Sequence, residues 1–129
     1  MAAFLLDSDA VIDYLNLWQP TVELINGLTQ EGHMLFTCDL VLAEVYAGLP
    51  PYPGIRAEDF LSNLIFLQSS RRAAIRAGEW RYLYARRGLN LPNYDVLIAA
   101  TALERDATLV TGNVRHYPMP ELSLLTLPR

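Results

Sequence analysis

An apolar run at the start of the chain, residues 2–6, is broken abruptly by Asp7. The run is short enough for a buried strand and too short for a helix. Asp9 is a suitable N-cap for a helix behind it, because apolar residues recur at helical spacing from Val11 onward. The strand would then deliver a carboxylate to its own carboxyl end, the edge of an open α/β sheet where ligands bind. Since a buried acid is costly unless something positive meets it, a metal ion is the simplest candidate partner.

Short apolar strands and helices alternate along the rest of the chain. Strands are predicted at residues 34–37, 64–67, 107–111 and 122–127, and helices at 20–31, 40–48, 57–63, 70–87 and 94–105. This order predicts an α/β fold of three layers, α/β/α, with a mostly parallel central sheet and helices on both faces. No repeat or linker interrupts it, so we expect one domain over residues 1–129.

Composition narrows the class of protein. The chain is 52% apolar and 19% charged, which is typical of a compact globular domain. Its one cysteine, Cys38, excludes an internal disulfide framework and fits a reducing compartment. No signal peptide and no run of about 20 apolar residues is visible. We therefore expect a soluble, cytoplasmic protein without a membrane anchor.

The chain contains no lysine, since all ten basic residues are arginine. This absence excludes the P-loop nucleotide site, whose lysine reaches the phosphates, and counts against receiver domains of similar size. The net charge of −4 argues against a generic nucleic-acid coat. It still allows a nucleic-acid enzyme in which an acidic pocket lies among local arginines.

Four polar residues interrupt apolar elements at a predicted end or inner face: Asp7, Glu44, Asp95 and Asn113. They lie on separate elements, so only the fold can bring them together. If the acids converge, their mutual repulsion raises their pKa values unless a divalent cation neutralises them. Ligation by oxygen alone suits Mg²⁺ or Mn²⁺.

Four segments of the sequence resemble the motifs of the PIN-domain ribonucleases, specifically the VapC-type toxins of prokaryotic toxin–antitoxin pairs. The first joins an apolar strand to an Asp and a hydroxyl residue, and the second surrounds a helical glutamate. The third opens the buried helix with an Asp, and the fourth closes the domain. They are residues 5–12, 42–48, 94–102 and 109–117. Each segment alone is weakly specific, but their order and distances together are strongly so.

The resemblance implies a PIN-like fold and a metal-dependent endoribonuclease that hydrolyses RNA phosphodiester bonds. By motif position, Asp7, Glu44 and Asp95 would bind Mg²⁺ or Mn²⁺, with Asn113 as the fourth member of the catalytic set. Many relatives carry Asp at that fourth position, whereas Asn binds metal without contributing a charge. The resemblance therefore leaves open whether the site holds one metal ion or two. The resemblance also implies that Ser8 and Thr111 position a carboxylate, a water or the scissile phosphate. Asp9 would contact the metal only indirectly.

The resemblance also implies partners. The family is usually paired with an antitoxin that covers the site, here a VapB-like protein, and commonly forms homodimers. RNA would be the substrate. The predicted helix over residues 70–87 holds six of the ten arginines, and helical geometry brings four of them to one side: Arg72, Arg76, Arg86 and Arg87. They form either a solvated face or contacts to RNA phosphates.

Two other functions compete with the nuclease. A haloacid-dehalogenase-like phosphatase would use Asp7 and Asp9 as its strand-end pair, but it normally needs a lysine and a later acidic pair, and both are missing. A PIN fold without catalysis, which docks RNA or a protein, is favoured only by Asn113. The three acids argue against it, because burying them without a metal would be costly.

Overall fold

The computed structural model describes residues 1–128, and Arg129, the last residue of the predicted domain, lies outside the described residues. The elements in chain order are β1 (Ala3–Leu6), α1 (Ser8–Leu15), α2 (Gln19–Gln30), β2 (Met34–Cys38), α3 (Asp39–Ala47), α4 (Ile55–Asn63), β3 (Ile65–Leu67), α5 (Arg71–Arg86), α6 (Asn93–Glu104), β4 (Thr108–Thr111), a 3₁₀ turn (Val114–His116) and β5 (Leu124–Thr126). The predicted order of strands and helices is confirmed, with boundaries shifted by one or two residues.

The five strands form one sheet in the order β3-β2-β1-β4-β5, and every neighbouring pair is parallel. The prediction of a mostly parallel sheet is therefore confirmed and extended. Because β1 pairs with β4, the residue after β1 and the last residue of β4 meet at the same carboxyl edge. Asp7 and Thr111, 104 positions apart in the chain, thus become neighbours.

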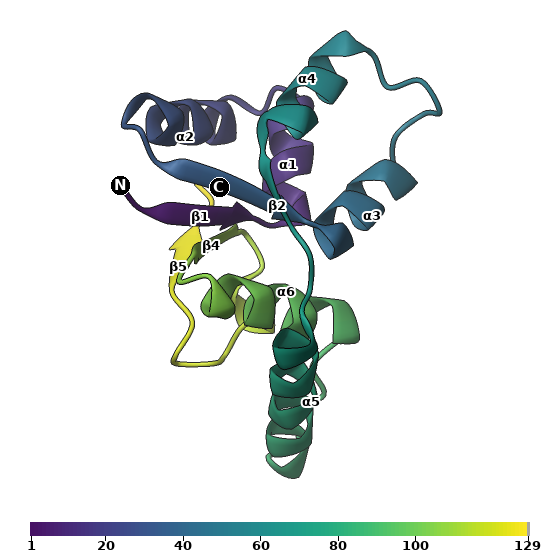
Figure 1. Ribbon diagram of the computed structural model, residues 1–129, viewed down its shortest axis with the longest axis vertical. Coiled ribbons are helices and arrows are strands. Elements are labelled where there is room, and N and C mark those ends of the chain that lie inside the picture. Colours follow the sequence, from purple (N-terminus) through teal and green to yellow (C-terminus); the bar gives the residue numbers. More distant parts are fainter. Residues whose placement is uncertain (129) are drawn as a thin grey trace.

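The three predicted layers are visible in Figure 1. Helices α1, α2 and α4 lie on one side of the strands, α5 and α6 lie on the other, and α3 extends beyond the strands' carboxyl ends. The apolar side chains between the layers are fully buried, among them Leu5, Phe36, Ile98 and Leu109. Within residues 1–128, no helix is both long and apolar enough to cross a bilayer.

The prediction that Asp9 caps the first helix is wrong. Strand β1 passes directly into α1, so Asp7, which keeps an extended backbone, becomes the N-cap and its carboxylate accepts the Ser8 N–H. Asp9 instead lies in the first turn, where its carboxylate accepts the Gly112 N–H at 2.8 Å. The first-turn position thereby lets the Asp9 side chain bind the loop that follows β4.

Two further details concern the helices of the second half. Asn93 is the first residue of α6, and the N-cap position belongs to Pro92. The Asn93 side-chain oxygen accepts a hydrogen bond from Arg81 of α5. Helix α5 runs without a break past Gly78.

Candidate acidic site

Asp7 lies at the carboxyl edge of the sheet and is held there by its side-chain hydrogen bonds. Its side chain is 4% exposed, and donors from three elements fix its two oxygens. Oδ1 accepts the Ser8 N–H at 2.9 Å, while Oδ2 accepts the hydroxyls of Thr111 at 2.8 Å and Tyr117 at 2.9 Å. Hydrogen bonds of this kind stabilise the ionised form of a buried carboxylate.

The loop after β4 is tied to the start of α1. The Gly112 N–H donates to Asp9, and the Asn113 N–H donates to the Thr111 hydroxyl at 3.0 Å. Thr111 therefore both accepts from this loop and donates to Asp7. These bonds place Asn113, an exposed residue, beside the edge that carries Asp7.

Asp95 lies in the first turn of α6, as predicted, and contacts a histidine. The His116 Nδ1 atom is 2.9 Å from Asp95 Oδ2. Burial raises the pKa of Asp95, and so does the nearby Asp7 carboxylate. The charge and hydrogen bond of His116 and the hydrogen bond of the Tyr117 hydroxyl lower it. The net direction is upward, so the partners do not fully offset burial and repulsion.

Glu44 is exposed on α3, yet it faces the same acids. Burial of part of its side chain raises the pKa of Glu44, and so do the carboxylates of Asp7, Asp95 and Asp9, while a hydrogen bond from Ser8 lowers it. Repulsion of this kind requires proximity, because exposed charges are screened within about 10 Å. The structure thus brings Asp7, Glu44 and Asp95 into one electrostatic neighbourhood. Their roles as ligands stay a prediction.

The donor set fits a hard divalent cation chemically. Every candidate ligand offers oxygen, and Mg²⁺ uses one or two protein carboxylates together with water. Among residues 1–128, however, no three Asp, Glu, His or Cys side chains stand close enough to enclose a metal ion. In this arrangement Asp95 contacts His116, and Asp7 is held by three donors.

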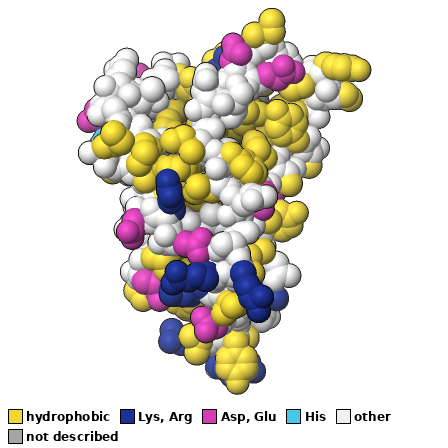
Figure 2. All heavy atoms as spheres, viewed as in Figure 1, with side chains coloured by type: hydrophobic (Ala, Val, Ile, Leu, Met, Phe, Trp, Pro, Cys, Tyr) yellow, Lys and Arg dark blue, Asp and Glu magenta, His cyan; other side chains and the backbone are white. Residues whose placement is uncertain are grey.

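The four predicted RNA-binding arginines fall into two separate pairs. Arg72 and Arg76 border a hollow with Glu104, the last residue of α6. Asp95 opens the same helix nine residues earlier, about 13 Å along its axis. The structure therefore places this pair away from Asp95. Figure 2 shows that the basic side chains visible on this face gather mainly in its lower half.

Arg86 and Arg87 lie at the other end of α5, over the rings of Tyr82 and Tyr84. The two helices run antiparallel, because Ser70 at the start of α5 binds Glu104 and Arg81 near its end binds Asn93. Arg86 and Arg87 thus extend past the end of α6 that carries Asp95.

Sequence reasoning missed three residues that contact this site or its supports: Tyr117, His116 and Arg81. Tyr117 and His116 belong to the fourth motif, which was the available signal. Arg81 donates to the Leu91 carbonyl and the Asn93 side chain just before Asp95. No sequence pattern marks it among five other arginines of the same helix.

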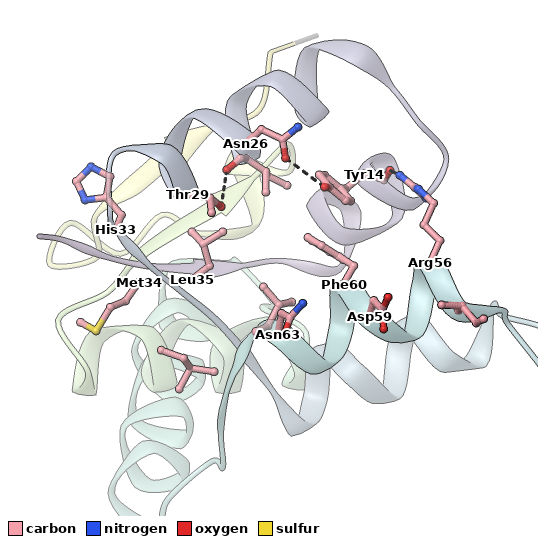
Figure 3. A pocket seen from close by; sticks show the side chains of 14 residues that line it. Tyr14, Asn26, Thr29, His33, Met34, Leu35, Arg56, Asp59, Phe60 and Asn63 are labelled. Atoms are coloured by element: carbon pink, nitrogen blue, oxygen red, sulfur yellow. Dashed lines mark hydrogen bonds between the residues drawn. The ribbon is translucent and has the colours of Figure 1, made fainter.

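A second hollow lies apart from the acids. A pocket of about 880 Å³ lies between α2 and α4, and residues of β2 contribute to its lining. Figure 3 shows the side chains that line it. The Tyr14 ring stacks on Phe60 at 4.0 Å between centroids, and Arg56 donates to the carbonyls of Tyr14 and Leu15. Its lining within residues 1–128 includes no member of the acidic site.

Comparison with known proteins agrees with the fold. The PIN domain family matches residues 4–122. Ribonuclease VapC19 of Mycobacterium tuberculosis is 33% identical over 121 residues, 92% of this chain and 95% of that protein. The tRNA(fMet)-specific endonuclease VapC of Salmonella typhimurium is 38% identical over 60 residues, 46% of each chain. The crystal structure of VapBC2 from Rickettsia felis bound to a promoter DNA fragment aligns with a TM-score of 0.83 at 25% identity, covering 98% of this chain and 99% of that one.

The chain therefore belongs to the PIN-domain family. Its near-full-length relatives are VapC ribonucleases, and within the family it is of the VapC type, the ribonuclease toxins of VapBC pairs. This result decides against the haloacid-dehalogenase-like alternative.

Proposed function

We propose that this chain is an endoribonuclease that hydrolyses RNA phosphodiester bonds with a divalent cation, Mg²⁺ or Mn²⁺, at the acidic edge. The observation that carries the proposal is the meeting of acids from separate elements at one edge of the sheet, where the Tyr117 hydroxyl donates to Asp7 Oδ2 and also lies beside Asp95. The pKa of Glu44, raised by burial and then by the carboxylates of Asp7, Asp95 and Asp9, agrees with this arrangement. Acids that repel one another in one place form a site that a cation would stabilise.

Asp7, Glu44 and Asp95 would hold the cation, with Asn113 as a neutral fourth oxygen donor. When bound, such an ion supplies charge stabilisation for a phosphodiester transition state. The chain's own residues supply orientation. Thr111 and the Ser8 N–H fix the Asp7 carboxylate, and the Gly112–Asp9 bond holds the β4 loop beside it.

We assign Arg86 and Arg87 to RNA phosphates in preference to Arg72 and Arg76, because they lie toward the Asp95 end of α6.

The test is cleavage of a panel of tRNAs and structured RNAs by the purified protein, in Mn²⁺ and in EDTA. The panel includes initiator tRNA, because one relative is a tRNA(fMet)-specific endonuclease. We expect cleavage of at least one RNA in Mn²⁺ and none in EDTA. Measurable RNA binding without cleavage or cation binding would contradict the proposal and favour the catalytically impaired docking module.

We also propose that a VapB-like antitoxin docks into the pocket between α2 and α4. The structures that resemble this chain include toxin–antitoxin complexes. The pocket lining is largely apolar, and its rim exposes Ile55 at 79% and Ile65 at 45%, which a partner's apolar side chains would cover. The homodimer expected from the family resemblance stays a prediction.

Paired replacement of Ile55→Glu and Ile65→Glu should weaken binding of the antitoxin by at least about tenfold, because it places two charges where apolar contact is needed. The partner to test is the product of a small open reading frame beside the gene, titrated by calorimetry. Ile75→Glu, on the exposed face of α5 outside the pocket, is the matched control. Equal affinity of the double variant and the control would contradict this docking site.

A further inference from the structure

The Tyr117 side chain is buried at 3% exposure, and its hydroxyl points at Asp7 rather than at solvent. Burial and the nearby Asp7 carboxylate raise the pKa of Tyr117, so the hydroxyl keeps its proton and acts as the donor. It also lies close enough to Asp95 to lower the pKa of that carboxyl. One neutral hydroxyl thus stands between two acids of the site.

Counting acceptor positions shows what this hydroxyl does. An ionised carboxylate offers about four lone-pair positions, two on each oxygen. On Asp7, Oδ2 already accepts from Thr111 and Tyr117, so both of its positions are filled. Oδ1 accepts only from the Ser8 N–H, so one position remains on that atom.

We infer that Tyr117 is a positioning residue that limits Asp7 to binding a divalent cation through one oxygen, Oδ1. This inference rests on the proposed metal-dependent activity. The consequence is cation selectivity, because Mg²⁺ requires near-octahedral sites with short bonds, whereas Ca²⁺ readily accepts both oxygens of one carboxylate. A saturated Oδ2 therefore favours Mg²⁺ over Ca²⁺ at Asp7.

Tyr117→Phe removes the hydroxyl and keeps the ring in the core. It frees one position on Oδ2 and makes two-oxygen binding possible. By calorimetry on RNA-free protein, we expect the ratio of the Mg²⁺ Kd to the Ca²⁺ Kd to rise about tenfold, the lower end of what loss of such a supporting bond costs at metal sites. Thr111→Val frees the other position on Oδ2 and should move the ratio in the same direction.

Tyr84→Phe is the matched control. Its hydroxyl is also buried and donates to the carbonyl of Pro118, the residue after Tyr117, at 3.3 Å. It should leave the ratio within about twofold of the wild-type value. An unchanged ratio in Tyr117→Phe, or equal weakening of both cations, would overturn the inference. If the wild-type protein nevertheless binds Mg²⁺ and cleaves RNA, the proposed function stands; if it does neither, both fall.

Discussion

Asp7→Asn is expected to lower metal-dependent RNA cleavage by about 10³-fold or more. A metal ion contributes several kcal/mol to such a reaction, and each 1.36 kcal/mol is a factor of ten in rate. The substitution removes the charge of the one candidate ligand that is buried and held by three donors. Single-turnover cleavage of the RNA found in the panel measures the effect.

The same substitution should leave the fold intact, because the Thr111 and Tyr117 hydroxyls can rotate to accept from the Asn NH₂ group if it takes the place of Oδ2. Asn is as good an N-cap as Asp, so α1 keeps its start, and the loss of one negative charge relieves repulsion on Glu44 and Asp95. The matched control is Asp39→Asn. Asp39 also follows a strand and opens α3, but its carboxylate accepts from Leu40 and Ser69 and is not one of the candidate ligands. An activity loss of similar size in both variants, or a lowered melting temperature in Asp7→Asn, would mean that Asp7 acts through stability.

The layers of the fold follow from local sequence because each strand is an apolar run ended by a polar residue. The convergence of Asp7, Glu44 and Asp95 was predictable for a related reason, since parallel strands and the helices that follow them share one edge. The hydrogen bonds that fix those acids and their supports could not be predicted from the sequence. The Tyr117–Asp7 bond spans 110 positions, and the Arg81–Asn93 bond depends on how α5 crosses α6.

The error over Asp9 has a specific physical origin. Both Asp7 and Asp9 are suitable caps, and the choice depends on whether any residue separates strand from helix. None does, because the Asp7 N–H still pairs with the Val110 carbonyl of β4 while its C=O already accepts the Val11 N–H of α1. One residue therefore ends the strand, caps the helix and carries the buried acid. The sequence pattern alone cannot show that pairing within the sheet gives Asp7 all three roles.

The metal-free protein should lose thermal stability as the pH rises above about 4. The pKa values of Glu44 and Asp95 are raised in the folded state above their ordinary values of 4.5 and 3.8, so the folded chain binds protons more tightly than the unfolded chain. Stability from these groups is full below the ordinary values and is lost as pH rises through the raised values. Glu44→Gln should flatten this dependence of the melting temperature on pH, whereas Glu23→Gln, exposed on α2, should not.

Mg²⁺ should restore the thermal stability that is lost at high pH, but only at pH values at which the carboxyl groups of the site are ionised. A ligand at 100 times its Kd stabilises the folded state by about 2.7 kcal/mol, which corresponds to roughly 10 °C in melting temperature for a domain of this size. We expect a shift of this order at pH 7.5 and almost none at pH 4, where protonated carboxyls bind the cation poorly. Asp7→Asn should abolish most of the shift at pH 7.5. A shift of equal size at both pH values, or one that survives in Asp7→Asn, would mean that the cation binds elsewhere on the chain and that the three acids serve another purpose.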